Sequence, residues 1–283
     1  MRVRVGSELT YETPQGAHMM ATVEPRNKSR YHTLVSSQRR IEPQNIMHDY
    51  ADGFGNHVWR IDAPAGTLTL YQDAIAEVPP GPNTVPDGLP KVPVRELPDE
   101  VMVYTLPSRY CQIEHFISDA WDMFGHIEGG SAQVQAVCDW LHENITYTAG
   151  STPTTSSFEA YKERTGVCRD FAHLGIVFCR SLNIPARYVS GFLPDINVPP
   201  DPNPMDFHAW FEAFVGGEWR TFDARHNIPR TGHVLIAYGR DAVDTAFSTA
   251  YGNLKLTKMK VWADEVNDDF TLPEPSPESA AAS

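Results

Sequence analysis

The sequence lacks any apolar run long enough to cross a membrane, and its mean hydropathy is −0.36. A helix that spans a bilayer needs about 20 consecutive apolar residues. The segment from Met1 to Glu8 also lacks the apolar core of a signal peptide. We therefore expect a protein with no membrane contact and no export signal.

Positive charge is scarce in this chain. The 23 Lys and Arg residues stand against 36 Asp and Glu residues, which gives a formal net charge of −13. Proteins that bind nucleic acids or anionic membrane surfaces present a basic face. The composition therefore predicts no nucleic-acid partner, and the sequence contains no glycine-rich phosphate-binding motif.

Cysteine is rare as well. The four cysteines are Cys111, Cys138, Cys168 and Cys179. They show no CxxC spacing and, without an export signal, reduced thiols in the cytoplasm fit best. The histidines of the first sixty residues do not follow metal-ligand spacing. We therefore predict a cytoplasmic protein with no metal and no cofactor.

The length of 283 residues suits one large or two medium domains. Short segments rich in β-branched and aromatic residues, punctuated by Gly and Pro, predict a β-sandwich-like domain over residues 1–80. Frequent prolines predict an extended linker over residues 81–107. Residues 263–283 are rich in Asp, Glu, Pro, Ser and Ala, which predicts a disordered acidic tail.

The clearest local pattern begins at Cys168. Apolar residues follow it at the spacing of one helix face: Phe171, Leu174, Gly175, Phe178 and Leu182. This spacing predicts an amphipathic helix with Cys168 in its first turn, on the inward face. The helix dipole lowers the pKa of a thiol there and favours the nucleophilic thiolate. A buried, unreactive cysteine is the alternative interpretation.

A thiolate nucleophile needs a base, and the base needs a group that orients it. His173 lies on the same predicted helix, but five residues after Cys168 it projects about 140° around the axis. We interpret it as a structural histidine. The better candidate base is His208, in the predicted strand 207–215, where it shares a face with Trp210.

The orienting group is predicted from a hairpin. Gly216-Gly217 has the composition of a two-residue turn, and a return strand follows it. Such a turn pairs Val215 with Glu218. This register places Asp223 on the same face as His208, as a diagonal neighbour about 7–8 Å away, within reach of an imidazole–carboxylate hydrogen bond.

Four segments carry a family resemblance: Gly166–His173, Ile184–Gly191, His208–Trp210 and Phe222–Asp223. Together they resemble the bacterial transglutaminase-like cysteine protease family over about residues 130–262. The resemblance implies an α+β fold in which an N-terminal β domain precedes a papain-like catalytic core at 108–262. It also implies a catalytic triad of Cys168, His208 and Asp223. Many members continue after the aspartate with Pro-Thr-Asn, whereas Ala224-Arg225-His226 follow here, so the resemblance leaves the substrate preference open.

Such a triad predicts a cysteine peptidase or amidase that acts on a peptide, protein or small amide through a thioester. Cys168 would attack the carbonyl, His208 would transfer the proton and Asp223 would hold the imidazole. The alternatives are an acyltransferase that passes the acyl group to an amine, and a non-catalytic binding scaffold of the same fold. The polar loops 148–157 and 194–204 are expected to flank the site and leave it open to water, which favours hydrolysis. The sequence does not indicate an oligomeric state.

Overall fold

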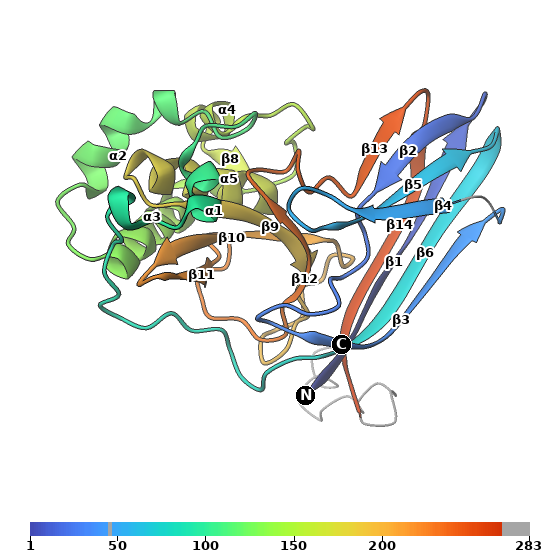
Figure 1. Ribbon diagram of the computed structural model, residues 1–283, viewed down its shortest axis with the longest axis horizontal. Helices are drawn as coiled ribbons and strands as arrows, with labels where there is room; N and C mark the ends of the chain where they lie inside the picture. Colours follow the sequence, from blue (N-terminus) through green and yellow to red (C-terminus); the bar gives the residue numbers. More distant parts are fainter. Residues whose placement is uncertain (45–46, 268–283) are drawn as a thin grey trace.

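The computed structural model describes residues 1–44 and 47–267. The molecule has a β half, formed by both ends of the chain, and an α+β half, formed by its middle (Figure 1). Within the described residues, no helix combines the length and apolar character needed to cross a membrane.

The β half contains two antiparallel sheets of four strands each. In spatial order, the long sheet comprises β14 (Lys255–Val266), β1 (Arg2–Thr13), β6 (Gly66–Glu77) and β3 (Thr33–Glu42). The short sheet comprises β13 (Ser248–Tyr251), β2 (Ala17–Ala21), β5 (His57–Ala63) and β4 (Met47–Ala51). The two sheets enclose a core that includes Leu9, Trp59 and Leu68. The predicted β-sandwich is confirmed.

One face of the long sheet packs against both the short sheet and the α+β half. Along β1, Leu9 and Tyr11 belong to the core shared with the short sheet. Val5 points to the same side of the strand, because side chains alternate, but it lies in a cluster with Phe192 and Val234 of the α+β half. The two halves are therefore joined by a continuous apolar interface.

Strand pairing corrects the predicted domain boundaries. β13 pairs with β2 and β14 pairs with β1, so residues 248–266 complete the β half. The boundary at 262 between the predicted core, 108–262, and the predicted tail, 263–283, does not hold, because Ala263–Val266 continue β14. An edge strand without this partner would expose a row of unpaired backbone groups. Residues 268–283 of the predicted tail lie outside the described residues.

The predicted linker, residues 81–107, is packed against the α+β half. It contains two 3₁₀ turns, Val94–Glu96 and Val103–Thr105, and the short helix α1 (Asp99–Met102). Leu97 and Val101 form a small apolar cluster with Phe214. The proline-rich composition therefore specifies an extended path along a surface, not a free tether.

The α+β half is a four-stranded antiparallel sheet covered by helices. The strands, in spatial order, are β11 (Glu218–Phe222), β10 (His208–Val215), β9 (Ala186–Phe192) and β12 (Val234–Gly239). The helical elements are a 3₁₀ turn at Ile113–His115, α2 (Ile117–Phe124), α3 (Gly130–Asn144), α4 (Ser157–Glu163) and α5 (Cys168–Ser181). A small parallel pair, β7 (Thr146–Tyr147) and β8 (Thr165–Gly166), precedes α5.

Helix α5 is buried on nearly all sides, not on one face as predicted. Gly175 faces Phe211 of β10, while Phe178 contacts the ring of Phe116 edge-on at a centroid distance of 5.3 Å. Several buried polar groups of α5 form hydrogen bonds with backbone groups outside the helix. The His173 Nε2, for example, accepts a hydrogen bond from the Ala242 N–H at 3.1 Å, which confirms the structural interpretation of His173.

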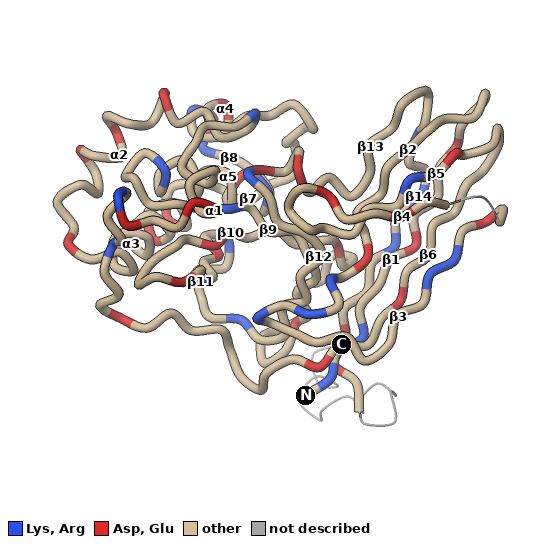
Figure 2. Tube along the Cα trace, viewed as in Figure 1, with Lys and Arg blue, Asp and Glu red and all other residues tan. Residues whose placement is uncertain are grey.

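Charged residues are distributed over both halves. Figure 2 shows Lys and Arg interspersed with Asp and Glu along the described part of the chain. Many of them form ion pairs across strands, such as Arg4 with Asp73 and Lys258 with Glu8. In the described part of the chain, acidic and basic residues are therefore intermixed and not gathered in one segment.

The contact between α5 and β10 gives a stability prediction. A Cβ atom at Gly175 would lie 2.3 Å from Phe211 Cε1, far inside van der Waals contact. We expect Gly175→Val to lower the free energy of unfolding by about 2–3 kcal/mol, as overpacked cores do, in urea denaturation. Gly53→Val is the control, because a Cβ there meets no atom within 4 Å. Equal unfolding midpoints for the two variants would contradict the packing argument.

Candidate active site

Cys168 is the first residue of α5 and borders a cleft. The Asp170 carboxylate accepts a hydrogen bond from the Val167 N–H at 2.9 Å, so the start of the helix is capped beside the thiol. Arg169 donates to the Thr152 carbonyl oxygen at 2.7 Å, which ties the loop before α4 to the same turn. Local contacts thus fix the position of the cysteine.

His208 and Asp223 are brought together by the β10–β11 hairpin. Val215 pairs with Glu218 as predicted, and Gly216-Gly217 both have positive φ, which a two-residue turn of this type requires. His208 begins β10 and Asp223 directly follows β11. Their side chains form a hydrogen bond, with 2.7 Å between His208 Nε2 and Asp223 Oδ2. The predicted contact between these two residues is confirmed.

The second oxygen of Asp223 is held by the residues that follow it. Asp223 Oδ1 accepts hydrogen bonds from the backbone N–H groups of Arg225, at 3.0 Å, and His226, at 3.4 Å. These are the positions at which the sequence departs from the Pro-Thr-Asn pattern. Because the bonds come from the backbone, the carboxylate keeps its orientation despite the different side chains.

Charges and hydrogen bonds among Cys168, His208 and Asp223 shift the pKa values of His208 and Asp223. Burial favours the neutral imidazole, but the charge and hydrogen bond of Asp223, together with the hydrogen bond and charge of Cys168, raise the pKa of His208 to about 9. Burial also favours a protonated Asp223, yet the charge and hydrogen bond of His208 hold the pKa of this carboxyl well below its usual range. Since Nε2 is bonded to Asp223, Nδ1 is the nitrogen left for Cys168. A positively charged imidazole beside a thiol favours the thiolate.

The cleft beside Cys168 has a volume of about 1150 Å³. Tyr147, Thr148 and residues 198–207 are among the residues that line it, so the predicted loop 194–204 does border the cleft. Of the predicted loop 148–157, only Thr148 and Ala149 contribute to the lining. Arg225 also lines the cleft, and its guanidinium carbon lies 3.9 Å from the centre of the Tyr147 ring.

Several charged cleft residues were missed at the sequence level: Asp195, Asp201, Asp206, Arg225 and Arg230. They lie in the loop that precedes β10 or in the turns that follow Asp223. Their nearness in sequence to His208 and Asp223 is the signal that could have identified them. Trp210, which was expected near the site, stacks on His208, but it is buried in a cluster with Tyr31 and Leu235 and does not line the cleft.

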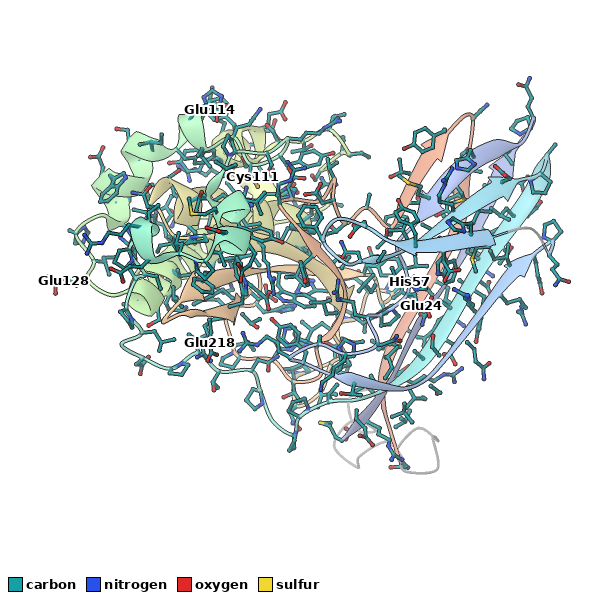
Figure 3. All side chains as sticks on the ribbon, in the orientation of Figure 1. Glu24, His57, Cys111, Glu114, Glu128 and Glu218 are labelled. Atoms are coloured by element: carbon teal, nitrogen blue, oxygen red, sulfur yellow. The ribbon has the colours of Figure 1, made fainter. Side chains whose placement is uncertain are left out.

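The other three cysteines are buried in the α+β half. Burial raises the pKa of the Cys111 thiol to about 12, and Figure 3 places this residue among the helices. Burial likewise raises the pKa values of Cys138 and Cys179. Cys168 is the only cysteine that is partly exposed, and all four are free thiols.

His208, Asp223 and His226 place potential ligand atoms within 4.8 Å of one another. However, Asp223 is engaged by His208, and the Arg230 guanidinium lies 3.3 Å from His226 Nδ1. This fixed positive charge opposes the binding of a cation. The arrangement suits an imidazole–carboxylate pair better than a metal centre.

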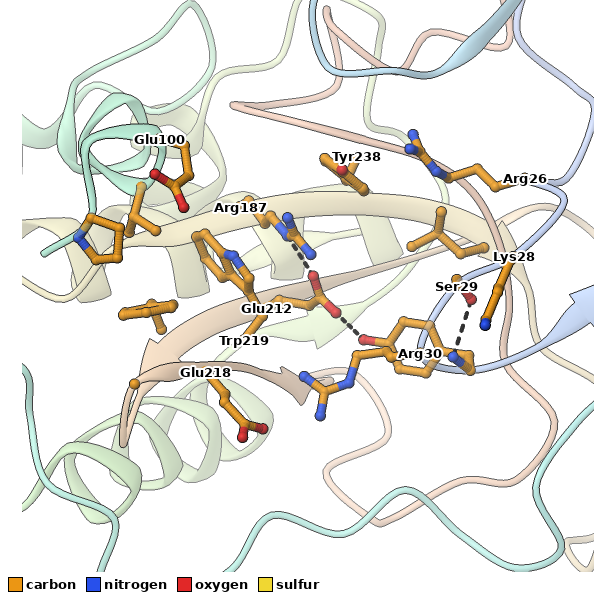
Figure 4. Close-up of a pocket in the computed structure, with 16 residues that line it drawn as sticks. Arg26, Lys28, Ser29, Arg30, Glu100, Arg187, Glu212, Glu218, Trp219 and Tyr238 are labelled. Carbon is orange, nitrogen blue, oxygen red and sulfur yellow. Dashed lines mark hydrogen bonds and ion pairs between the residues drawn. The ribbon is translucent and has the colours of Figure 1, made fainter.

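Strand β10 is also anchored on the face opposite α5. Its fully buried Glu212 accepts hydrogen bonds from Arg187, at 2.5 Å, and from the Tyr31 hydroxyl (Figure 4). The Arg187 guanidinium lies between the rings of Trp219 and Tyr238, at 4.3 and 4.0 Å from their centres. The strand that carries His208 is therefore held by the N-terminal segment as well as by the helix.

Comparisons with known proteins agree with this architecture. Residues 122–224 match the family model of the transglutaminase-like superfamily. The chain is 34% identical to a candidate cysteine protease from Cytophaga hutchinsonii, whose crystal structure superposes with a TM-score of 0.86 and covers 96% of this chain and 93% of that one. It is also 28% identical to an uncharacterised protein of Mycobacterium leprae, over 87% of this chain and 90% of the relative. The chain therefore belongs to the transglutaminase-like superfamily.

The burial of the thiols gives the first prediction for the site. We expect iodoacetamide at near-neutral pH to label Cys168 at least about 100-fold faster than Cys111, Cys138 or Cys179, because only thiolates react and buried thiols stay protonated. Peptide mass spectrometry after limited labelling measures the four rates. Labelling of Cys111 as fast as that of Cys168 would remove the basis for the nucleophile assignment.

The coupled pair gives a pH prediction. The folded-state pKa of His208, about 9, lies above its ordinary value of 6.5. The pair therefore stabilises the fold fully below pH 6.5, and this contribution is lost as the pH rises from 6.5 to about 9. Urea unfolding of wild type and Asp223→Asn across this window should show a difference in stability that shrinks with pH. A difference independent of pH would refute the coupling.

Proposed function

We propose that this protein is a cysteine-dependent hydrolase that cleaves an amide or peptide bond through a thioester intermediate. The proposal rests chiefly on one observation: Cys168, at the start of α5, shares a cleft with His208, whose Nε2 lies 2.7 Å from Asp223. The similarity to a candidate cysteine protease supports a peptide or protein substrate. Cys168, His208 and Asp223 are the proposed catalytic residues.

In this proposal the Cys168 thiolate attacks the carbonyl carbon of the substrate. The proton on His208 Nδ1 passes to the leaving amine, the C–N bond breaks, and a thioester remains on Cys168. Water then attacks the thioester while His208 takes its proton. Asp223 holds the imidazole in the required orientation and stabilises its charged form. The Cys168 N–H, in the first helical turn where no intrahelical carbonyl accepts it, is the proposed oxyanion donor.

The character of the cleft favours water over an amine as the second substrate. Transfer to an amine requires a site that excludes water. Here the walls carry several charged side chains and a proline-rich loop with exposed residues at 199–204. Such a surface is hydrated, so the thioester is open to hydrolysis.

The test combines trapping and product analysis. The protein is incubated with a pool of peptides and amides, and intact mass identifies an acyl adduct that is absent in Cys168→Ser. For a peptide that acylates Cys168, the ratio of free acid to amine adduct is then measured with and without a millimolar primary amine. We expect free acid as the main product. If the amine adduct predominates, the protein is an acyltransferase and not a hydrolase. If no substrate acylates Cys168, a binding scaffold is favoured.

Asp223→Asn tests the role of the carboxylate. We expect this variant to remain folded, with a kcat about 10²–10⁴-fold lower. The neutral Asn amide does not stabilise the charged imidazole of His208 and can hold it in the wrong tautomer. Asp122→Asn, at an exposed position of α2, is the matched control and should retain full activity. Comparable activity of the two variants would show that Asp223 has no part in catalysis.

A further inference from the structure

The cleft contains one carboxylate that lacks an ionic partner. Arg230 Nη2 lies 2.9 Å from Asp195 Oδ1, and Arg225 Nη2 lies 3.4 Å from Asp201 Oδ2. Asp206, which lines the same cleft, forms no ion pair with any residue that the structure describes. Its Oδ1 accepts a hydrogen bond from the adjacent Phe207 N–H at 2.7 Å.

Asp206 lines the same cleft as Cys168 and His208. It stands two residues before His208, in the loop that leads directly into β10. Its charge acts on His208 and on the Tyr147 hydroxyl, which in turn senses the charge of Cys168. The side chain remains accessible to solvent, and partial burial in the cleft raises the pKa of its carboxyl. A group that binds beside Cys168 would therefore meet this carboxylate.

The balance of charge in the cleft is negative. Apart from Cys168 and His208, the lining has three acidic residues and two arginines. His226 adds no positive charge at neutral pH, because burial lowers its pKa to about 4. Arg230 and Arg225 form ion pairs with Asp195 and Asp201, and the charge of Arg225 also acts on Asp206. Three carboxylates therefore share two arginines, and Asp206 is the one that has no ion-pair partner among the described residues.

We infer that Asp206 determines specificity, and that it selects substrates with an ammonium or guanidinium group next to the scissile amide, as in peptides with lysine or arginine at that position. A cation there would form the ion pair that Asp206 lacks, close to the nucleophile. This inference rests on the proposed function for the identity of the reaction, but the recognition of the cation can be measured without it.

The first test uses thiol reagents that differ only in charge. The Cys168 thiolate displaces methanesulfinate from a methanethiosulfonate and forms a mixed disulfide. The probes are the 2-aminoethyl reagent, which is cationic, and the 2-sulfonatoethyl reagent, which is anionic. We expect the cationic reagent to react faster, and the ratio of the two rates to fall by about three- to tenfold in Asp206→Asn, as expected for removal of one nearby charge.

Glu128→Gln is the matched control. Glu128 is exposed at the outer edge of the α+β half, away from the β half (Figure 3), and its loss changes the net charge by the same amount. Its rate ratio should stay within about twofold of wild type. A ratio in Asp206→Asn that equals that of Glu128→Gln would overturn the inference. The Asn side chain can keep the bond to the Phe207 N–H, and Asp206→Ser provides a second neutral variant if Asp206→Asn does not fold.

The second test uses peptide amides that carry lysine, norleucine or glutamate before the scissile bond. Preference of wild type for lysine, lost in Asp206→Asn, supports the inference. Cleavage with no preference for lysine overturns it and leaves the proposed function intact. If no peptide is cleaved but the reagent ratio still depends on Asp206, hydrolysis is refuted and the recognition of cations beside Cys168 is supported.

Discussion

The inward face of the long sheet determines how the rest of the molecule is arranged. This one apolar surface is formed by β1, β6 and β14. Residues such as Leu70 pack against the short sheet, and residues such as Ala74 and Ala76 pack against the α+β half. Neither half could expose its share of that surface to water without losing a large part of its buried apolar area. The β half is therefore part of one folding unit with the proposed catalytic core, although none of its described residues lines the cleft.

This interface reaches the proposed active site through Phe207. The side chain packs against both apolar clusters of the long sheet, and its ring lies 5.5 Å from that of Phe192 and 5.6 Å from that of Phe247. The next residue is His208. The position of the imidazole is thus determined from three directions: by Phe207, by the packing of α5 on β10, and by the bonds of Glu212 to Arg187 and Tyr31. Such support is what a catalytic group needs to remain in a productive orientation.

The parts of the structure that could be predicted from the sequence depend on local rules. A Gly-Gly turn sets the hairpin register, and strand alternation then sets the face, so the contact between His208 and Asp223 followed from a few residues. The pairing of β14 with β1 could not be predicted in this way, because both strands alternate suitably for many partners and lie at opposite ends of the chain. The burial of α5 was missed for a related reason. Its residue Arg180 indicates a solvent-exposed face, but the guanidinium is buried and donates to the backbone carbonyl oxygens of Ala186 and Arg240, which lie in other parts of the chain.

The proposed catalytic residues and the proposed specificity residue also differ in how far local sequence patterns predict their positions. Cys168, His208 and Asp223 lie at the ends of regular elements, where periodic sequence patterns and a tight turn determine their positions. Asp206 and Arg225 lie in loops whose prolines and charges carry no periodic pattern, and only the structure shows which of these charges are paired. Loop residues can change without disturbing the packing of α5 on β10, whereas a change in the hairpin register would move His208 away from Asp223. The fold therefore allows the substrate preference to vary while the arrangement of the three proposed catalytic residues stays the same.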